Sequence, residues 1–234
     1  MNHSFILCER GKHMDDRIKE IADAATMLFL QQGYTKTQIS HIAKAVGVSV
    51  GTIYLSFAGK KEILHYILKC TIDPEYREQE FERPIKDAQF EGIEDEIVDM
   101  LQKINRDFAS HLENEAKDYT LEEMISDAFD ILYRYSAGCL FIEKNSFDFP
   151  YLAENYKECR SNFLAAMKHY FEIFIKKGIV REPESLDLSI TLIIEILSWW
   201  AMDRRFTSFE LCDVSEELAK RVCMDNIITA YKKQ

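Results

Sequence analysis

Two short helical patterns joined by only three residues are the feature that most constrains this fold. Thr37 is a suitable amino-terminal cap for the first helix, Gly47 stands where a left-handed residue ends it, and Ser49 caps the second. The inward positions are Ile39, Ile42, Ala43 and Val46 in the first helix and Ile53 and Phe57 in the second. Because the turn is so short and Ala43 is small enough for the helices to cross, the spacing predicts a helix-turn-helix.

Gly51 lies inside the second of these helices, where glycine costs about 1 kcal/mol relative to alanine. Close approach of the backbone to another molecule is a common compensation. The pattern therefore favours a helix shaped to enter a groove.

The rest of the chain predicts an all-α protein. Its 234 residues contain 8 glycines and 4 prolines, too few for a many-turned β protein. The predicted helices are Asp15–Gln32, Lys60–Ile72, Ile93–Ala116, Thr120–Asn145, 150–177, Pro183–Phe206 and Val214–Tyr231. We expect residues 1–70 to form a helix-turn-helix domain, with residues 1–14 disordered, and residues 71–234 to form a helical body that begins with a charged linker, 73–92.

Charge divides the chain in the same way. Residues 1–70 carry nine Lys and Arg against six Asp and Glu, a net +3, whereas residues 71–234 carry 20 against 34, a net −14. A basic head on an acidic body suits a protein whose head alone meets polyanions, although chance variation on solvated faces remains the alternative. The six cysteines form no C-x-x-C pair, which favours reduced thiols in the cytoplasm. No apolar run is long enough to span a membrane.

The stretch TQISHIAKAVGVSVGTIYLSFAGKKEILHYIL, residues 37–68, resembles the signature of the TetR family of bacterial transcriptional regulators, as does the preceding FLQQGY, residues 29–34. The specific match covers about residues 15–65. The resemblance implies a homodimeric repressor whose two heads bind successive major grooves of a palindromic DNA operator. It also implies a body pocket for a small-molecule effector that moves the heads out of register.

The expected DNA-binding residues combine hydroxyl, cationic and apolar side chains. Hydroxyl groups and helix amino termini bind phosphate oxygens, and apolar side chains contact thymine methyl groups. Family members often place a cationic residue where this chain has Val50 and Leu55; the alternative is that both pack against the following helix. The predicted set is Thr37, Gln38, Lys44, Ser49, Val50, Gly51, Thr52, Tyr54, Leu55 and Lys60, and Lys36 is a further candidate.

The segment Pro183–Phe206 is apolar on nearly every side, so both of its faces should be buried, one of them by a partner. We expect a two-fold dimer built on this helix and the last one. The predicted interface residues are Trp200, Ala219, Val222, Cys223, Asn226 and Ala230.

An effector pocket is expected between the body helices. Asp187, Thr191, Glu195 and Ser198 form a polar stripe on the apolar helix, and a buried carboxylate needs a partner. Glu195 either pairs with an internal cation or meets a cationic or hydroxylated ligand. The predicted effector-binding residues are Phe108, Tyr133, Phe163, Glu195 and Trp199, although core packing is the commoner role of such aromatic residues.

Catalysis is not expected. The chain has no nucleophile elbow, phosphate-binding glycine loop or metal-ligand cluster, and we expect no cofactor and no bound metal. The alternative to a ligand-responsive regulator is a DNA-bound adapter or architectural protein of the same fold without a small-molecule ligand.

Overall fold

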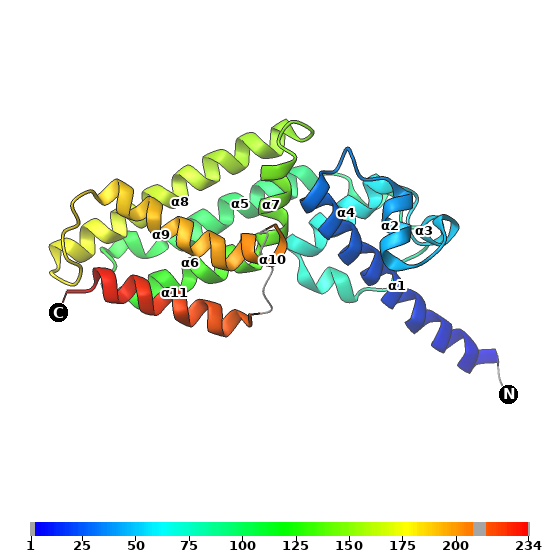
Figure 1. Cartoon of the computed structure of the whole chain (residues 1–234), viewed down its shortest axis with the longest axis horizontal. Coiled ribbons are helices and arrows are strands. Elements are labelled where there is room, and N and C mark those ends of the chain that lie inside the picture. The colour runs from blue at the N-terminus through cyan, green and yellow to red at the C-terminus, as the bar shows by residue number, and fades with distance from the viewer. Residues whose placement is uncertain (1–2, 208–213, 234) are drawn as a thin grey trace. The chain divides into compact units, whose positions relative to one another are not determined.

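The computed structural model describes residues 3–207 and 214–233, with side chains from residue 16 onward (Figure 1). The described residues form helices and two isolated β-bridges, without a β-strand, which confirms the all-α prediction. The chain divides into two compact units, Met1–Ile97 and Val98–Gln234.

The first unit contains the predicted helix-turn-helix. Its helices are α1 (His3–Gln32), α2 (Ile39–Val46), α3 (Val50–Ser56) and α4 (Lys60–Ile72), followed by the 3-10 turns η1 (Pro74–Glu78) and η2 (Asp87–Phe90). Gly47 ends α2 with φ +76°, the left-handed conformation that favours glycine. Ile42, Ile53 and Phe57 are completely buried and join α2 and α3 to α1 and α4.

The segment after α4 packs onto the first unit, so the division falls at Ile97/Val98 and not after residue 70. The Ile85 amide donates to the Ser56 carbonyl at 2.9 Å, and the Ala58 amide donates to the Ile85 carbonyl at 2.9 Å. These bonds attach the segment to the end of α3. The charge of residues 73–92 suggested a linker, but the completely buried Ile85 anchors it.

Helix α1 begins at His3, whereas the apolar spacing predicts a start at Asp15. No proline interrupts the chain before Gln32, so nothing in the backbone forces the later start. The predicted disorder of residues 1–14 stays a prediction.

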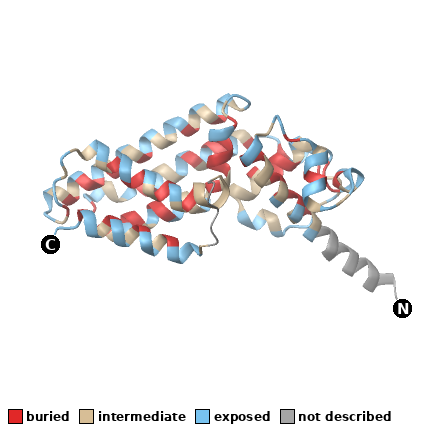
Figure 2. Cartoon of the chain, viewed as in Figure 1, coloured by how far each residue is buried: buried red, intermediate tan, exposed pale blue. Residues whose placement is uncertain are grey.

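The second unit is a bundle of long helices, with buried residues along their inward sides (Figure 2). Its elements are α5 (Ile93–Ala109), whose first residues belong to the first unit, η3 (Ser110–Asn114), α6 (Leu121–Arg134), α7 (Ser136–Lys144), α8 (Pro150–Lys176), α9 (Leu186–Ser198), the π-helix η4 (Trp199–Asp203), α10 (Arg204–Phe206) and α11 (Glu216–Tyr231). Helix α9 packs on α6 and α8, and α11 packs on α6 and α9.

The predicted helix Thr120–Asn145 is broken at Tyr135 into α6 and α7. Arg205 explains the position of the break. Its guanidinium donates to the Tyr133 carbonyl at 2.8 Å and the Ser136 hydroxyl at 2.7 Å, one on each side of Tyr135. It also lies 3.7 Å from the centroid of the Tyr133 ring. Burial lowers the pKa of Arg205, although Tyr133 and Glu216 act in the opposite direction.

Candidate DNA-binding surface and effector cavity

Helix α3 presents apolar side chains to solvent. Val50, Tyr54 and Leu55 are 41%, 48% and 68% exposed, and Gly51 lies between them on the surface. The alternative that Val50 and Leu55 pack against α4 is therefore wrong. Gln38 and Lys44 on the neighbouring α2 are exposed too. With Ser49, which is exposed as well, seven of the predicted DNA-binding residues thus lie on the exposed surface of the helix-turn-helix.

The capping residues fix the start of each of these helices. Ser49 caps α3, since its hydroxyl accepts from the Thr52 amide at 3.1 Å, and the two hydroxyl groups lie 2.9 Å apart. Gln38, and not Thr37, is the cap of α2, in a capping box with His41. Ser49 remains exposed at the amino terminus of α3, the end of a helix that attracts anions.

Thr37 does not belong to the exposed surface. It is buried, its hydroxyl donates to the Gly33 carbonyl at 2.8 Å, and the Gln32 amide donates to it at 3.1 Å. Its hydroxyl closes the loop between α1 and α2. By residue type Thr37 was a reasonable candidate for binding phosphate. Its hydroxyl also lies 3.4 Å from the carbonyl of Leu28, nine residues earlier, and a local sequence pattern does not reveal such a contact.

Lys60 also has internal partners. Its ammonium group donates to the carbonyls of Tyr34 at 2.8 Å and Thr37 at 2.9 Å, and lies 4.2 Å from the centroid of the Tyr34 ring. The side chain therefore joins the start of α4 to the α1–α2 loop. These contacts make its main role structural, in contrast to the phosphate contact that its position suggested.

A small apolar cavity lies inside the second unit. Its volume is about 50 Å³, enough for a water or two but too small for an effector. The lining residues come from α5, α6, α7, α8 and α9 and are Leu101, Ile104, Ile131, Leu132, Tyr135, Cys139, Tyr156, Cys159, Arg160, Phe163, Leu164, Ile194 and Ser198. Of the predicted effector-binding residues, Phe163 lines this cavity.

The other predicted effector-binding residues have different surroundings. Phe108 is buried and stacks on Phe163, with 4.4 Å between ring centroids, while Tyr133 holds Arg205. Glu195 and Trp199 are exposed and are absent from the described lining of the cavity. Glu195 was assigned to the pocket from the polar stripe and Trp199 as an aromatic residue, but the stripe faces solvent and only its last residue, Ser198, reaches the cavity.

A polar cluster that the sequence pattern did not identify lies at one side of the cavity. The Tyr156 hydroxyl donates to Glu143 Oε1 at 3.0 Å, and Arg160 donates to the same oxygen at 2.6 Å. Burial raises the pKa of Tyr156, with further contributions from Cys139 and Glu143. Burial opposes the charge of Arg160, but Tyr156 and Glu143 more than offset it, so its pKa is raised. The cluster connects α7 to α8.

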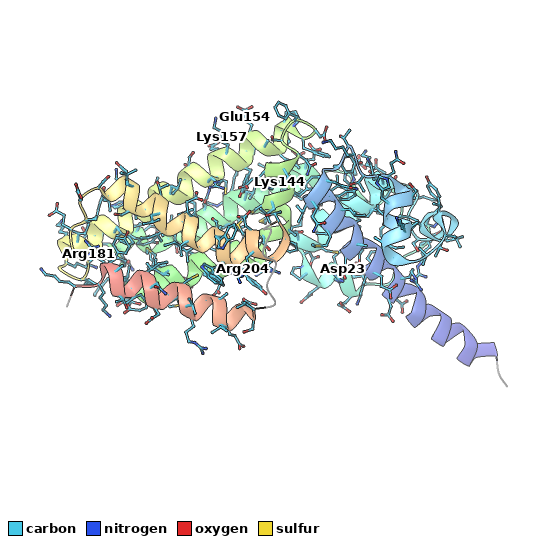
Figure 3. All side chains as sticks on the ribbon, viewed as in Figure 1. Asp23, Lys144, Glu154, Lys157, Arg181 and Arg204 are labelled. Carbon is cyan, nitrogen blue, oxygen red and sulfur yellow. The ribbon has the colours of Figure 1, made fainter. Side chains whose placement is uncertain are left out.

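Two larger pockets flank this cavity. One, of about 400 Å³, shares Tyr156, Arg160 and Leu164 with the cavity and is also lined by Glu143 and Lys157. The other, of about 240 Å³, shares Leu101 and Cys159 with the cavity. Figure 3 labels Lys157 on α8, which lines the first of these pockets, together with Lys144 on α7 and Glu154 on α8.

Helices α9 and α11 carry exposed apolar residues. On α9 these are Leu188 and Leu192, followed by Trp199 at the start of η4, and on α11 they are Leu218 and Val222. We name these five residues the α9–α11 face.

The predicted interface residues divide between this region and the core. Val222, Asn226 and Ala230 are exposed on α11, whereas Ala219 and Cys223 are buried within the unit. The prediction for Ala219 and Cys223 is therefore corrected: small size suited them to the core of their own unit. Trp200 is half-buried, with Arg204 4.5 Å from its ring centroid.

Within the described part of the chain, no helix is long and apolar enough to cross a membrane. The same residues contain no group of three or more His, Cys, Asp or Glu side chains placed to hold a metal ion.

Comparison with known proteins identifies relatives of the amino-terminal unit. The family model described as bacterial regulatory proteins, tetR family, matches residues 21–67. The chain is 43% identical over 75 residues to the HTH-type transcriptional regulator HbdR of Aromatoleum sp. (strain CIB), a match covering 32% of each chain. It is 37% identical over 54 residues to the biofilm operon icaADBC HTH-type negative transcriptional regulator IcaR of Staphylococcus aureus (strain Newman), covering 23% of this chain and 29% of the relative. The chain thus spans about a third of the length of the curated relatives that it matches.

A solved structure is similar over most of the chain. The ketosteroid transcriptional regulator KstR2 of Mycobacterium tuberculosis is 16% identical, with a TM-score of 0.53, and the match covers 93% of this chain and 96% of that one. At this identity the similarity concerns the fold alone.

Proposed function

We propose that this chain, whose residues 21–67 match the model of bacterial regulatory proteins, tetR family, is a member of that family and a ligand-responsive repressor that acts in the cytoplasm. It binds a palindromic DNA operator as a homodimer and is released by a small-molecule effector. The observation that carries this proposal is the exposed surface of α3, where Val50, Gly51, Tyr54 and Leu55 form a narrow, partly apolar ridge. Negative regulation is proposed because the relative IcaR is by name a negative regulator.

The chemistry of this ridge supports binding in the major groove. Val50 and Leu55 suit thymine methyl groups, and the exposed Lys44 and Gln38 suit phosphate and base edges. A dimer would place two α3 helices in successive major grooves. Selection of bound fragments from random double-stranded DNA should therefore enrich an inverted repeat with half-site centres about 10–10.5 base pairs apart, or a multiple of that spacing. Enrichment of a single unrepeated site would contradict the dimeric mode, and absence of enrichment would contradict specific binding.

Gly51 supplies a sharper test. A Cβ at this position would meet the Ser49 hydroxyl at 3.6 Å, an ordinary contact, so packing within the unit does not require glycine. Gly51→Ala should raise the free energy of unfolding by up to about 1 kcal/mol, because alanine favours the helix. It should also weaken DNA binding about tenfold or more, because the added methyl group overpacks the contact with the DNA backbone. Urea unfolding and fluorescence anisotropy measure the two effects.

Ala45→Gly is the matched control for this test, since Ala45 is exposed on the neighbouring α2. It should destabilise the unit and leave DNA affinity nearly unchanged. Tight DNA binding by Gly51→Ala would contradict close approach of α3 to DNA.

The α9–α11 face supports the proposed homodimer. Five large apolar side chains exposed on two adjacent helices form the kind of patch that a partner surface buries. A second copy of the chain is the economical partner, because a two-fold axis packs α9 and α11 of one copy against α9 and α11 of the other. Asn226 and Ala230 continue the exposed side of α11 beyond Val222.

Val222→Arg tests this interface, because it places an unpaired charge in the centre of the proposed contact while leaving the core of the unit intact. We expect a monomer by light scattering at micromolar concentration, with helical circular dichroism retained. Asp118→Arg, an exposed position distant in sequence from both helices, should remain dimeric. A stable dimer of Val222→Arg would place the interface elsewhere.

A further inference from the structure

We propose that the effector is an elongated apolar molecule with a carboxylate at one end, and that this carboxylate displaces Glu143 from Arg160 and Tyr156. The inference rests on the proposed ligand-responsive function and names its ligand class. It replaces the cationic or hydroxylated ligand that was one of the two alternatives for Glu195, because Glu195 is exposed and outside the described lining of the cavity.

A ligand in the cavity would meet a positive charge. Among the described lining residues of the cavity, Arg160 is the one charged side chain. Glu143 lines the flanking pocket of about 400 Å³ together with Arg160 and Lys157. A ligand with its body in the cavity would therefore meet the guanidinium of Arg160 directly. A cationic end group would be repelled there, whereas a carboxylate would form charge-assisted hydrogen bonds.

Two hydrogen-bond donors surround the carboxylate of Glu143. One carboxylate oxygen of Glu143 accepts from both Tyr156 and Arg160, at 3.0 and 2.6 Å. These two α8 side chains therefore already form a carboxylate-binding pair, and Glu143 of α7 occupies it. A ligand carboxylate would satisfy the same two donors, and Glu143, whose side chain is 31% exposed, would turn toward water.

The larger flanking pocket gives a ligand a route into the small cavity. The cavity of about 50 Å³ does not hold an apolar chain unless it expands. Tyr156, Arg160 and Leu164 line both this cavity and the larger flanking pocket. A ligand entering from the flanking pocket would pass these residues and open the contact between α7 and α8. The remaining lining is suited to an aliphatic or aromatic body: Leu101, Ile104, Ile131, Leu132 and Ile194.

Displacement of Glu143 gives a physical basis for a response. Glu143 connects α7 to α8 only while its carboxylate stays bound to Arg160 and Tyr156. A ligand that binds better when this connection is open shifts the protein toward the open arrangement by its difference in affinity for the two states. Where DNA favours the arrangement in which Glu143 stays bound, DNA and ligand weaken each other by the same factor.

Three matched probes test the ligand class on the full chain: dodecanoate, 1-dodecanol and dodecyltrimethylammonium. They share an alkyl chain and differ in the charge of the end group. Isothermal titration calorimetry below their aggregation concentrations should show dodecanoate binding at least about tenfold tighter than the other two. Equal affinities, or a preference for the cation, would overturn the proposal.

Variants of the cluster locate the site. Arg160→Gln should remove the preference for dodecanoate, and Arg160→Lys should restore part of it, because lysine keeps the charge without the planar pair of donors. Glu143→Gln removes the competing charge and should tighten dodecanoate several-fold without changing 1-dodecanol. Glu154→Gln, an exposed carboxylate on α8 (Figure 3), should change neither affinity.

The two stages of the inference can fail separately. If Arg160→Gln does not fold, as judged by circular dichroism, the Glu143→Gln comparison decides alone: unchanged dodecanoate affinity would overturn the displacement of Glu143. Dodecanoate that binds as expected but leaves the affinity for the selected DNA unchanged would contradict the ligand-responsive function and retain the carboxylate site. Release of DNA by the cationic probe alone would retain the regulatory function and overturn the carboxylate site.

Discussion

Replacing Arg205 with methionine should lower the stability of the second unit by about 2–3 kcal/mol, the usual size of lost hydrogen bonds to a charged group. The guanidinium donates to the Tyr133 carbonyl and the Ser136 hydroxyl at 2.8 and 2.7 Å, and both acceptors flank the break between α6 and α7. Methionine fills much of the same volume but donates no hydrogen bond. Thermal unfolding followed by circular dichroism measures the loss.

Arg205→Lys and Arg221→Met are the controls for this prediction. Lysine keeps the charge but not the forked donor geometry, so most of the loss should remain. Arg221 is exposed on α11, and its replacement should change stability by less than about 0.5 kcal/mol. Unchanged stability of Arg205→Met would mean that the break between α6 and α7 is maintained without this side chain.

Replacing Lys60 with methionine should destabilise the first unit by about 2 kcal/mol, because two carbonyl oxygens lose a charged donor and the Tyr34 ring loses its cation. The α1–α2 loop should loosen, with faster amide hydrogen exchange there. DNA affinity should fall as a consequence of this loosening, with little change in the slope of log K against log salt concentration.

A direct phosphate contact by Lys60 would give the opposite combination. Its loss would lower the magnitude of the salt slope by about 0.9 and leave stability nearly unchanged. Lys61→Met is a suitable control, since Lys61 is exposed and its ion pair with Asp87, at 2.8 Å, is expected to contribute under about 1 kcal/mol. Comparison of the two variants separates a structural lysine from a phosphate-binding one.

The sequence by itself determined the helix-turn-helix and its exposed surface. Gly47, Ser49 and Ile53 act through contacts a few residues away, so their spacing specifies the turn, the cap and the inward face of α3. Tyr54 and Leu55 are exposed for the same local reason, since they point away from the side of the seven-residue helix that buries Ile53. The all-α class likewise follows from periodicity and the scarcity of glycine and proline.

Only the tertiary structure decided the roles that depend on distant partners. Thr37 and Lys60 suit phosphate by residue type, yet their polar groups are satisfied by carbonyls of the α1–α2 region. Ala219 and Cys223 lie on the inward side of α11, while Val222 and Ala230 lie on its exposed side. The cluster of Tyr156, Arg160 and Glu143 combines residues from two helices. Helical periodicity predicts which residues share a face of a helix. Packing against other helices decides which of these faces is buried in the core. A side chain's hydrogen-bond partners are fixed only when distant segments come together.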